Sequence, residues 1–245
     1  MDELGKQVQP AVTRQAINKY EKGQTMPDSR MLIAFSMALG VKPDYFFRPF
    51  TVAVDKIMFN KKTGVSERAV SSIREKVREE LERYLEIEEL CGIRTDFTLE
   101  KREVENADDV RRYAGDVRSK HGLGLDGISN VIEVFEDNGI KIIEISENKS
   151  FGGLSGYAND NIPVIVVNRN LPSEEKRFTL LHELGHLIIG LPAGYDIKEI
   201  EHLCNVFASE MLVPSSVLKG RLGNTRHDIS LAELSDIQKQ YGASI

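Results

Sequence analysis

The sequence predicts an α+β fold in which a small, mainly antiparallel sheet and an apolar helix follow an all-α amino-terminal domain. Three strand-like pieces, 139–146, 151–158 and 163–170, stand close together and are followed at once by the apolar helix pattern. Residues 1–50, in contrast, divide into three short helices with recognisable caps and stops. We therefore expect three regions: a helical domain at 1–50, an extended linker and long helix at 51–106, and an α+β domain at 107–245.

Composition narrows the class of protein. A length of 245 residues allows one large or two smaller domains, and an apolar content of 41% with 29% charged residues is typical of soluble globular proteins. The net charge of −6 argues against a protein that coats nucleic acid along its whole surface, but it allows a small DNA-reading module at one end. Two cysteines give no disulfide framework, no leader opens the chain and no apolar run approaches the roughly 20 residues of a membrane span. We expect a cytoplasmic protein that does not enter a membrane.

The helical domain begins with a short helix, Asp2 to Val8. Thr13 is the expected cap of a second helix, Arg14 to Lys22, which Gly23 closes, and Asp28 that of a third, Ser29 to Leu39, which Gly40 closes. The apolar spacing of the second helix leaves five polar side chains pointing outward: Arg14, Gln15, Asn18, Lys19 and Lys22. Such residues can read adenine edges or hold phosphates and guanine, although a solvated helix face has the same composition.

The amino-acid sequence of this region resembles that of a known family. The stretch TRQAINKYEKGQTMPDSRMLIAFSMALGVKPDYFF is similar to the helix-turn-helix of phage-repressor-like (XRE-type) regulators, whose recognition helix runs into a Y-E-x-G-x-x-x-P-D-S stretch. That stretch is present here as Tyr20, Glu21, Gly23, Pro27 and Asp28. The resemblance implies DNA binding through the second helix. It also implies that the first helix of this chain corresponds to the second of the family's five helices. The segment between Leu4 and Arg14 is then about two residues longer than the usual turn.

Residues 51–106 are expected to connect the two domains. Phe50 to Thr63 is expected to be extended, because the apolar residues Val52, Val54 and Ile57 alternate with other residues as in a strand. A long helix follows from about Ser66 to Cys91, and its apolar stripe includes Ile73, Val77 and Leu81. The stripe fits two arrangements, the seam of a homodimer or a brace on the following domain, and the brace is the default.

The third region predicts helices at 107–120 and 126–138, the second with Asp126 as its cap. Asn159, Asp160 and Asn161 form the expected turn of a hairpin between the last two strands. An extended peptide can add to the edge of such a sheet. Gly152, Gly153 and Gly156 permit close approach of a peptide, although turn or bulge chemistry explains them equally well.

The apolar helix contains the pattern H-E-x-x-H within FTLLHELGHLIIG, residues 178–190. His182 and His186 are four residues apart and so lie on one helix face, where two imidazoles can bind one metal ion. Glu183 follows the first histidine and is placed to act as a general base on water. A chance arrangement on a core helix is the alternative, but buried histidines then need partners. Catalytic zinc takes a third protein ligand, and the next helix, about 197–212, offers Glu199, Glu201, His202 and Glu210. Helical geometry alone leaves Glu201 and Glu210 open.

The whole arrangement resembles the ImmA/IrrE family of metallopeptidases. HELGHLIIG followed by ExxCNxFAxEMLVP is similar to the family's HELGH and ExxANxFAxxLLMP over roughly residues 115–245. The resemblance implies a zincin-like catalytic domain with His182, His186 and Glu201 as ligands and Glu183 as the base. Zinc is the expected ion, and manganese or iron can occupy the same ligands. Cys204 stands where alanine is usual, which indicates a small buried residue, and LAELSDIQKQYGASI is similar to the start of a helical element that relatives continue.

The resemblance also implies a function. Members of the family are cytoplasmic regulators, and several cleave a partner repressor that is often itself a helix-turn-helix protein. We therefore expect a metallo-endopeptidase fused to a DNA-binding module. The alternative is a DNA-binding regulator whose metal domain senses or stabilises without proteolysis. A peptidase also needs an oxyanion stabiliser, for which Tyr157, His202 and His227 are candidates.

Overall fold

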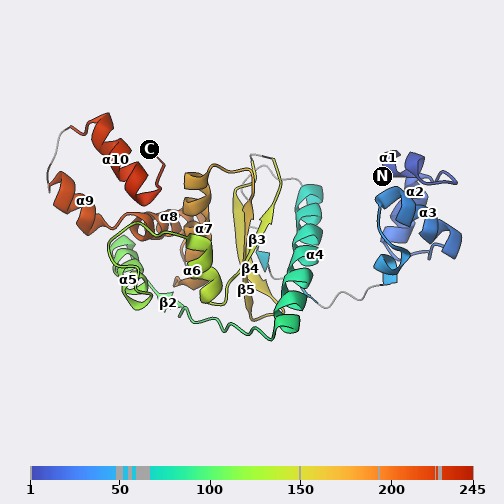
Figure 1. The fold of residues 1–245 in the computed structure, drawn as a ribbon, viewed down its shortest axis with the longest axis horizontal. Coiled ribbons are helices and arrows are strands. Elements are labelled where there is room, and N and C mark those ends of the chain that lie inside the picture. Colours follow the sequence, from blue (N-terminus) through green and yellow to red (C-terminus); the bar gives the residue numbers. More distant parts are fainter. Residues whose placement is uncertain are drawn as a thin grey trace. The chain divides into compact units, whose positions relative to one another are not determined.

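The computed structural model describes residues 2–47, 52–54, 57–58, 67–148, 150–192, 194–223, 225 and 228–244. Phe50, Thr63, Ser66 and His227, which carry sequence predictions, lie outside these ranges. The chain divides into two compact units, Met1–Thr51 and Val52–Ile245, which Figure 1 shows at the blue end and over the rest of the chain. Each unit has its own buried core and is described by itself.

The first unit is all-α, as predicted. It contains α1 (Asp2–Gln7), α2 (Arg14–Glu21), α3 (Ser29–Leu39) and a short 3-10 helix, η1 (Pro43–Phe47). The predicted caps are confirmed: Thr13 accepts a hydrogen bond from the Ala16 N–H at 3.2 Å, and Asp28 accepts one from the Met31 N–H at 2.8 Å. Gly40 ends α3 in the left-handed conformation, at a φ of 68°, which glycine adopts without strain. The core of the unit includes Val8, Ile17 and Phe35.

The second unit is built on a four-stranded sheet with the order β1-β4-β5-β3. Its strands are β1 (Ile57–Met58), β3 (Lys141–Ile145), β4 (Gly153–Ala158) and β5 (Ile162–Asn168). Both neighbours of β4 are antiparallel to it, and β3 is parallel to β5, so the sheet is mainly antiparallel as predicted. The predicted hairpin turn is also confirmed, because Asn159 and Asp160 both have positive φ, as a tight turn between β4 and β5 requires.

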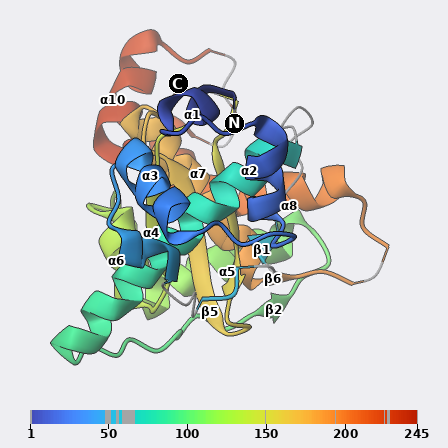
Figure 2. The same ribbon diagram turned by 90° about the vertical axis from the view of Figure 1, so that its right-hand side faces the viewer.

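Helices cover both faces of this sheet (Figure 1): α4 (Glu67–Cys91) lies on one face, and α6 (Val131–Asp137) and α7 (Ser173–Ile188) lie on the other. Alternate residues of a strand point to opposite faces. Ile143, Val164 and Val166 accordingly join the core under α4, whereas Ile142, Ile165 and Val167 join the core under α7. In Figure 2, α4 lies in front of the strands and α7 behind them. The apolar stripe of α4 therefore braces the sheet within the chain, with Ile73, Val77 and Leu81 all buried.

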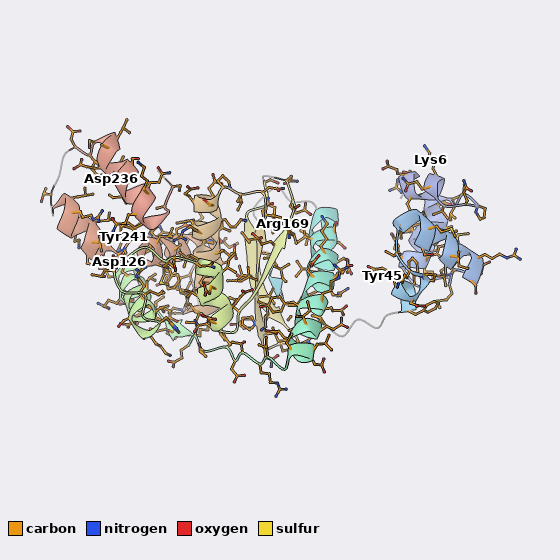
Figure 3. All side chains as sticks on the ribbon, in the orientation of Figure 1. Lys6, Tyr45, Asp126, Arg169, Asp236 and Tyr241 are labelled. Carbon is orange, nitrogen blue, oxygen red and sulfur yellow. The ribbon has the colours of Figure 1, made fainter. Side chains whose placement is uncertain are left out.

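One predicted boundary is wrong. Helix α5 (Ala107–Lys120) lies as expected, but α6 spans Val131–Asp137, five residues shorter at its start than predicted. Asn130 caps α6, not Asp126: its side chain accepts hydrogen bonds from the Ile132 and Glu133 N–H groups. The buried Arg118 guanidinium donates to the Asp126 carbonyl and so holds that residue outside the helix. The same loop packs on the end of α10 (Leu231–Tyr241), where the Tyr241 hydroxyl donates to the Leu125 carbonyl (Figure 3).

Two helices and a short two-stranded ladder complete the unit. Helix α8 spans Ile197–Leu212, with a capping box between Asp196 and Glu199, and α9 spans Ser215–Leu222. A two-stranded parallel ladder, which the sequence did not predict, joins β2 (Arg102–Glu103) to β6 (Ile189–Gly190) at the end of α7. None of the helices in the described part of the chain is both long enough and apolar enough to cross a membrane.

Candidate metal centre

The H-E-x-x-H motif lies in the buried second half of α7, packed between the sheet and α8. Leu180, Leu181, Leu184 and Leu187 anchor the helix in the larger core cluster, together with residues of α5 and α8. Gly185 faces Cys204 of α8, where a β-carbon built on the glycine would lie at ordinary van der Waals distance, 3.4 Å, from the Cα, Cβ and Sγ atoms of the cysteine. The two helices therefore pack against each other at this point of α7, beside the histidines.

Three potential ligand atoms converge at this crossing. The Nε2 atoms of His182 and His186 are 3.1 Å apart, and each lies 3.3 Å from a carboxylate oxygen of Glu201. Ligands held about 2.0–2.2 Å from a tetrahedral zinc ion are separated by about 3.3–3.5 Å, so the spacing fits such an ion. Nitrogen and carboxylate donors are also the ones that zinc takes in catalytic sites. In the described part of the chain, His182, His186 and Glu201 are the group of histidine, cysteine and acidic residues that can hold a metal.

The ring orientation of His182 is fixed by a contact on the side opposite the other two ligands. Its Nδ1 lies 2.9 Å from the Oδ1 of Asn205, which is one turn along α8 from Glu201. An amide oxygen only accepts, so this contact requires the proton on Nδ1 and leaves the Nε2 lone pair directed at the other two ligands. Asn205 therefore selects the histidine tautomer that binds a metal, a role that sequence reasoning did not assign to it.

Cys204 lies beside the site without completing it. Its Sγ is 3.5 Å from the Nδ1 of His186, the ring nitrogen that faces away from the other ligands. Burial, and after it the negative charges of Glu201 and Glu183, raise the pKa of the Cys204 thiol. A neutral, buried thiol on the far side of His186 agrees with the predicted role as a small packing residue.

Glu183 is buried and is held by the sheet. Its Oε2 accepts a hydrogen bond of 2.8 Å from the Ser155 hydroxyl, which β4 directs toward α7. Gly153, two residues earlier on the same face of β4, leaves room for this approach: a β-carbon there would lie 2.7 Å from Thr179 and 3.4 Å from Glu183. The structure thus gives Gly153 a strand–helix packing role. Ser155 was missed from the sequence, although its two-residue spacing from Gly153 places it on the same strand face.

The other candidates have different surroundings. Glu210, the alternative third ligand, accepts hydrogen bonds from the N–H and hydroxyl of Ser215, the first residue of α9, and so is bound at the start of that helix. Glu199 belongs to the capping box of α8. The hydroxyl of Tyr157 donates to the Leu187 carbonyl at 3.4 Å, and burial raises its pKa. His202 lies on the exposed side of α8.

The predicted DNA-contacting residues lie together on α2 and at its end. Arg14, Gln15, Lys19 and Lys22 are exposed, whereas Asn18 is partly buried. Ile17, on the opposite face of the helix, packs in the core of the unit. Arg14 also lies 3.7 Å from Asp2, in an ion pair that is exposed on both sides. The polar face of α2 is therefore available at the surface of its own unit.

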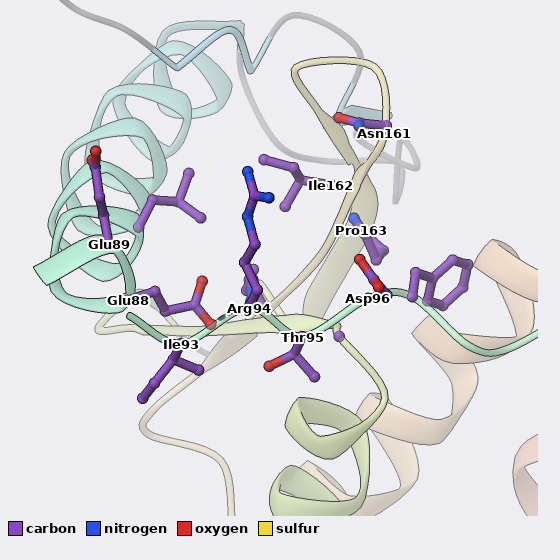
Figure 4. A pocket seen from close by; sticks show the side chains of 13 residues that line it. Glu88, Glu89, Ile93, Arg94, Thr95, Asp96, Asn161, Ile162 and Pro163 are labelled. Atoms are coloured by element: carbon purple, nitrogen blue, oxygen red, sulfur yellow. Dashed lines mark hydrogen bonds and ion pairs between the residues drawn. The ribbon is translucent and has the colours of Figure 1, made fainter. Parts of the chain in front are cut away.

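Two hollows lie away from the metal residues. One, of about 590 Å³, lies between the end of α4 and the sheet and is lined by residues that include Glu88, Arg94, Asp96 and Lys141 (Figure 4). Its buried Lys141 is already paired with Glu88 at 2.5 Å. The other, of about 410 Å³, is an apolar hollow in the first unit. Neither contains a residue of the H-E-x-x-H motif.

Comparison with known families agrees with both halves of the chain. Residues 135–245 match the model of the IrrE N-terminal-like domain of the M78 peptidases, and residues 1–46 match a helix-turn-helix model. No curated protein matches the chain. The M78 match begins in α6 and includes all three potential ligands and Glu183, whereas the helix-turn-helix match covers α1 to η1. The chain thus joins a helix-turn-helix domain to an IrrE N-terminal-like domain of the M78 peptidase family.

Proposed function

We propose that the protein is a cytoplasmic zinc-dependent endopeptidase that cleaves a partner transcriptional repressor, itself a helix-turn-helix protein. The observation that supports this most directly is the convergence of His182, His186 and Glu201 within 4.8 Å. Glu183 lies in the same buried site and is held by Ser155. A purely structural zinc site has four protein ligands and needs no base. Three ligands, with the Glu201 side chain 32% exposed, favour a site open to water and substrate.

Each residue has a role in this proposal. His182, His186 and Glu201 hold the ion, and Asn205 fixes the ring of His182. A bound zinc ion supplies Lewis acidity, which acidifies water and polarises a peptide carbonyl. Glu183 takes the proton of the attacking water and returns it to the leaving amine. The Ser155 hydroxyl stabilises the ionised form of Glu183 and fixes its direction.

The substrate is expected to bind as an extended strand. β4 is the strand that carries Ser155 and Gly153 against the metal-binding helix, and β5 covers its inner edge along its whole length. A peptide that pairs with β4 must therefore use its outer edge, which β1 occupies at Ser155 and Gly156. Main-chain hydrogen bonds along this edge give affinity without demanding one sequence.

The decisive experiment combines metal analysis with cleavage of the repressors encoded beside this gene, and mass spectrometry identifies the fragments. The wild-type protein is expected to hold about one zinc ion per chain and to cut one of the repressors. Glu183→Gln should keep the zinc and lose the cleavage, whereas the double variant His182→Ala, His186→Ala should lose both. Equal cleavage by Glu183→Gln would remove Glu183 as the base.

The exposed face of α2 favours a second function, DNA binding by the first unit. Lysine contacts to phosphates release counterions, so Lys19→Ala and Lys22→Ala should each reduce the salt dependence of DNA affinity by about one ion. Gln15→Ala should instead relax sequence preference at one base pair. Binding that is equally tight and equally salt-dependent in all three variants would assign the contacts to another surface.

A further inference from the structure

The outer edge of β4 is already paired with another part of the same chain. Strand β1, Ile57–Met58, runs antiparallel to β4, with Ile57 opposite Gly156 and Met58 opposite Ser155. Ser155 is the residue whose hydroxyl binds Glu183. The segment that leads from the helix-turn-helix unit therefore forms backbone pairs directly beside the candidate base.

The beginning of this segment is firmly anchored. Val52 and Val54 are buried in the core beneath α4. Between them, the Ala53 N–H donates to the Asn159 side chain at 2.7 Å, and the Ala53 carbonyl accepts from the Asn159 N–H at 3.0 Å. These contacts lie at the far end of β4, beyond Ala158, and they direct the chain toward Ser155.

The end beside Glu183 is held more weakly. Among the residues that the structure describes, the ladder between β1 and β4 contains two residue pairs, whereas that between β4 and β5 contains six. A ladder of two pairs provides few hydrogen bonds, and another strand can replace it. Because the anchored valines keep Ile57 and Met58 close to the edge, a substrate in solution must compete against a high effective concentration of the resident strand.

We propose that Ile57–Met58 is a built-in competitor of the substrate: it occupies the outer edge of β4, and a substrate strand must displace it to lie beside Glu183. The inference rests on the proposed peptidase function, since it concerns access to the same site. It makes strand β1, near the start of the second unit, an inhibitor of proteolysis that acts whichever repressor is cut.

The test uses the full-length, zinc-loaded protein and a double variant, Ile57→Pro, Met58→Pro, in which β1 can no longer donate an N–H to β4. The matched control, Ile57→Val, Met58→Leu, keeps its backbone donors. Successive N–H groups of a strand point to opposite sides, and the Asn168 N–H donates to the Gly152 carbonyl, so the Ser155 amide faces β1 and the Gly156 amide faces β5. Hydrogen exchange of the Ser155 amide should be roughly tenfold faster in the proline variant and unchanged in the control, whereas the Gly156 amide should stay protected in both. Asn159→Gly, which removes the acceptor for Ala53 while tolerating the positive φ of the turn, should shift exchange in the same direction.

Two zinc-binding probes distinguish access to the outer edge of β4 from access to the metal itself. Acetohydroxamate reaches only the metal and should bind the wild-type, proline and control proteins alike. A tripeptide hydroxamate also needs the outer edge of β4, so its affinity should rise roughly tenfold in the proline variant alone. Equal affinity of the tripeptide probe for all three proteins, or unchanged exchange of the Ser155 amide, would overturn the proposal that β1 competes with the substrate. Failure of acetohydroxamate to bind any of them would instead refute the metal centre, and the inference would fall with it.

Discussion

Asn205 fixes the tautomer and the ring orientation with which His182 would bind a metal. Its side-chain oxygen contacts the Nδ1 of His182 at 2.9 Å and so fixes both the tautomer and the ring plane. Partners of this kind behind a ligating histidine contribute about 10–100-fold in metal affinity. Asn205→Ala should therefore weaken zinc binding by that factor, measured by competition with a chromogenic chelator. His202→Ala, an exposed neighbour on the same helix, is the matched control, and an equal loss in both variants would reject the role of Asn205.

The choice between Glu201 and Glu210 is testable in the same assay. A carboxylate oxygen of Glu201 lies 3.3 Å from the Nε2 of each histidine, whereas Glu210 accepts hydrogen bonds from Ser215 at the start of α9. Glu201→Ala should reduce zinc affinity more than the loss of Asn205 does, because it removes a ligand itself. Glu210→Ala should leave zinc affinity unchanged but lower the free energy of unfolding by about 1 kcal/mol, because the Ser215 N–H loses its acceptor. The reverse pattern would exchange their roles.

The sequence could predict only part of this site, and the reason is geometric. His182, Glu183 and His186 belong to one helix, where spacing alone places them on neighbouring positions. Glu201 needed the family resemblance, because spacing within α8 left Glu210 equally open. Ser155 and Asn205 reach the site through the packing of β4 and α8 on α7, and no local pattern specifies which of their neighbours they meet.

At the scale of elements, the start of α6 depends on which residue caps it. The Asn130 side chain accepts from two backbone N–H groups of the first turn, whereas the predicted cap, Asp126, lies in the preceding loop. Asn130→Ala should therefore lower the free energy of unfolding by about 1 kcal/mol. Asp126→Ala should change it by no more than about 0.5 kcal/mol, as expected for an exposed loop position. Urea denaturation of the zinc-loaded protein measures both, and a larger cost at Asp126 would restore the predicted boundary.

The elements that the sequence predicted well are those with strong local signals. Helices α3, α5 and α8 have clear caps and apolar periodicity. The turn residues Asn159, Asp160 and Asn161 predicted the hairpin of β4 and β5. The ladder of β2 with β6 contains two residues on each side, too few for any period to emerge. The error at α6 arose because the Asp126 carbonyl accepts a hydrogen bond from Arg118, a tertiary contact that outweighs a local cap signal.

At the scale of the molecule, the two units have separate cores with different amounts of buried apolar surface. The first unit has 51 residues, and in its described part the core holds four buried apolar side chains. The second unit places two core clusters on the two faces of one sheet. Small domains bury a smaller fraction of their surface and keep little stability in reserve. The helix-turn-helix unit is therefore the part that a core substitution unfolds most easily.

A pair of phenylalanine variants tests whether this separation extends to function. Phe35→Ala removes a buried ring that packs edge-on against Tyr20 at 6.0 Å in the first unit. Phe207→Ala removes a fully buried ring of α8 from the core that supports the metal centre. Each substitution should lower the free energy of unfolding of its own unit by about 3–5 kcal/mol. Phe35→Ala should unfold the first unit and abolish DNA binding while zinc affinity stays unchanged, whereas Phe207→Ala should weaken zinc binding and leave the exchange of α2 amides as in the wild type. A fall in zinc affinity on Phe35→Ala would show that the metal centre depends on the folded helix-turn-helix unit.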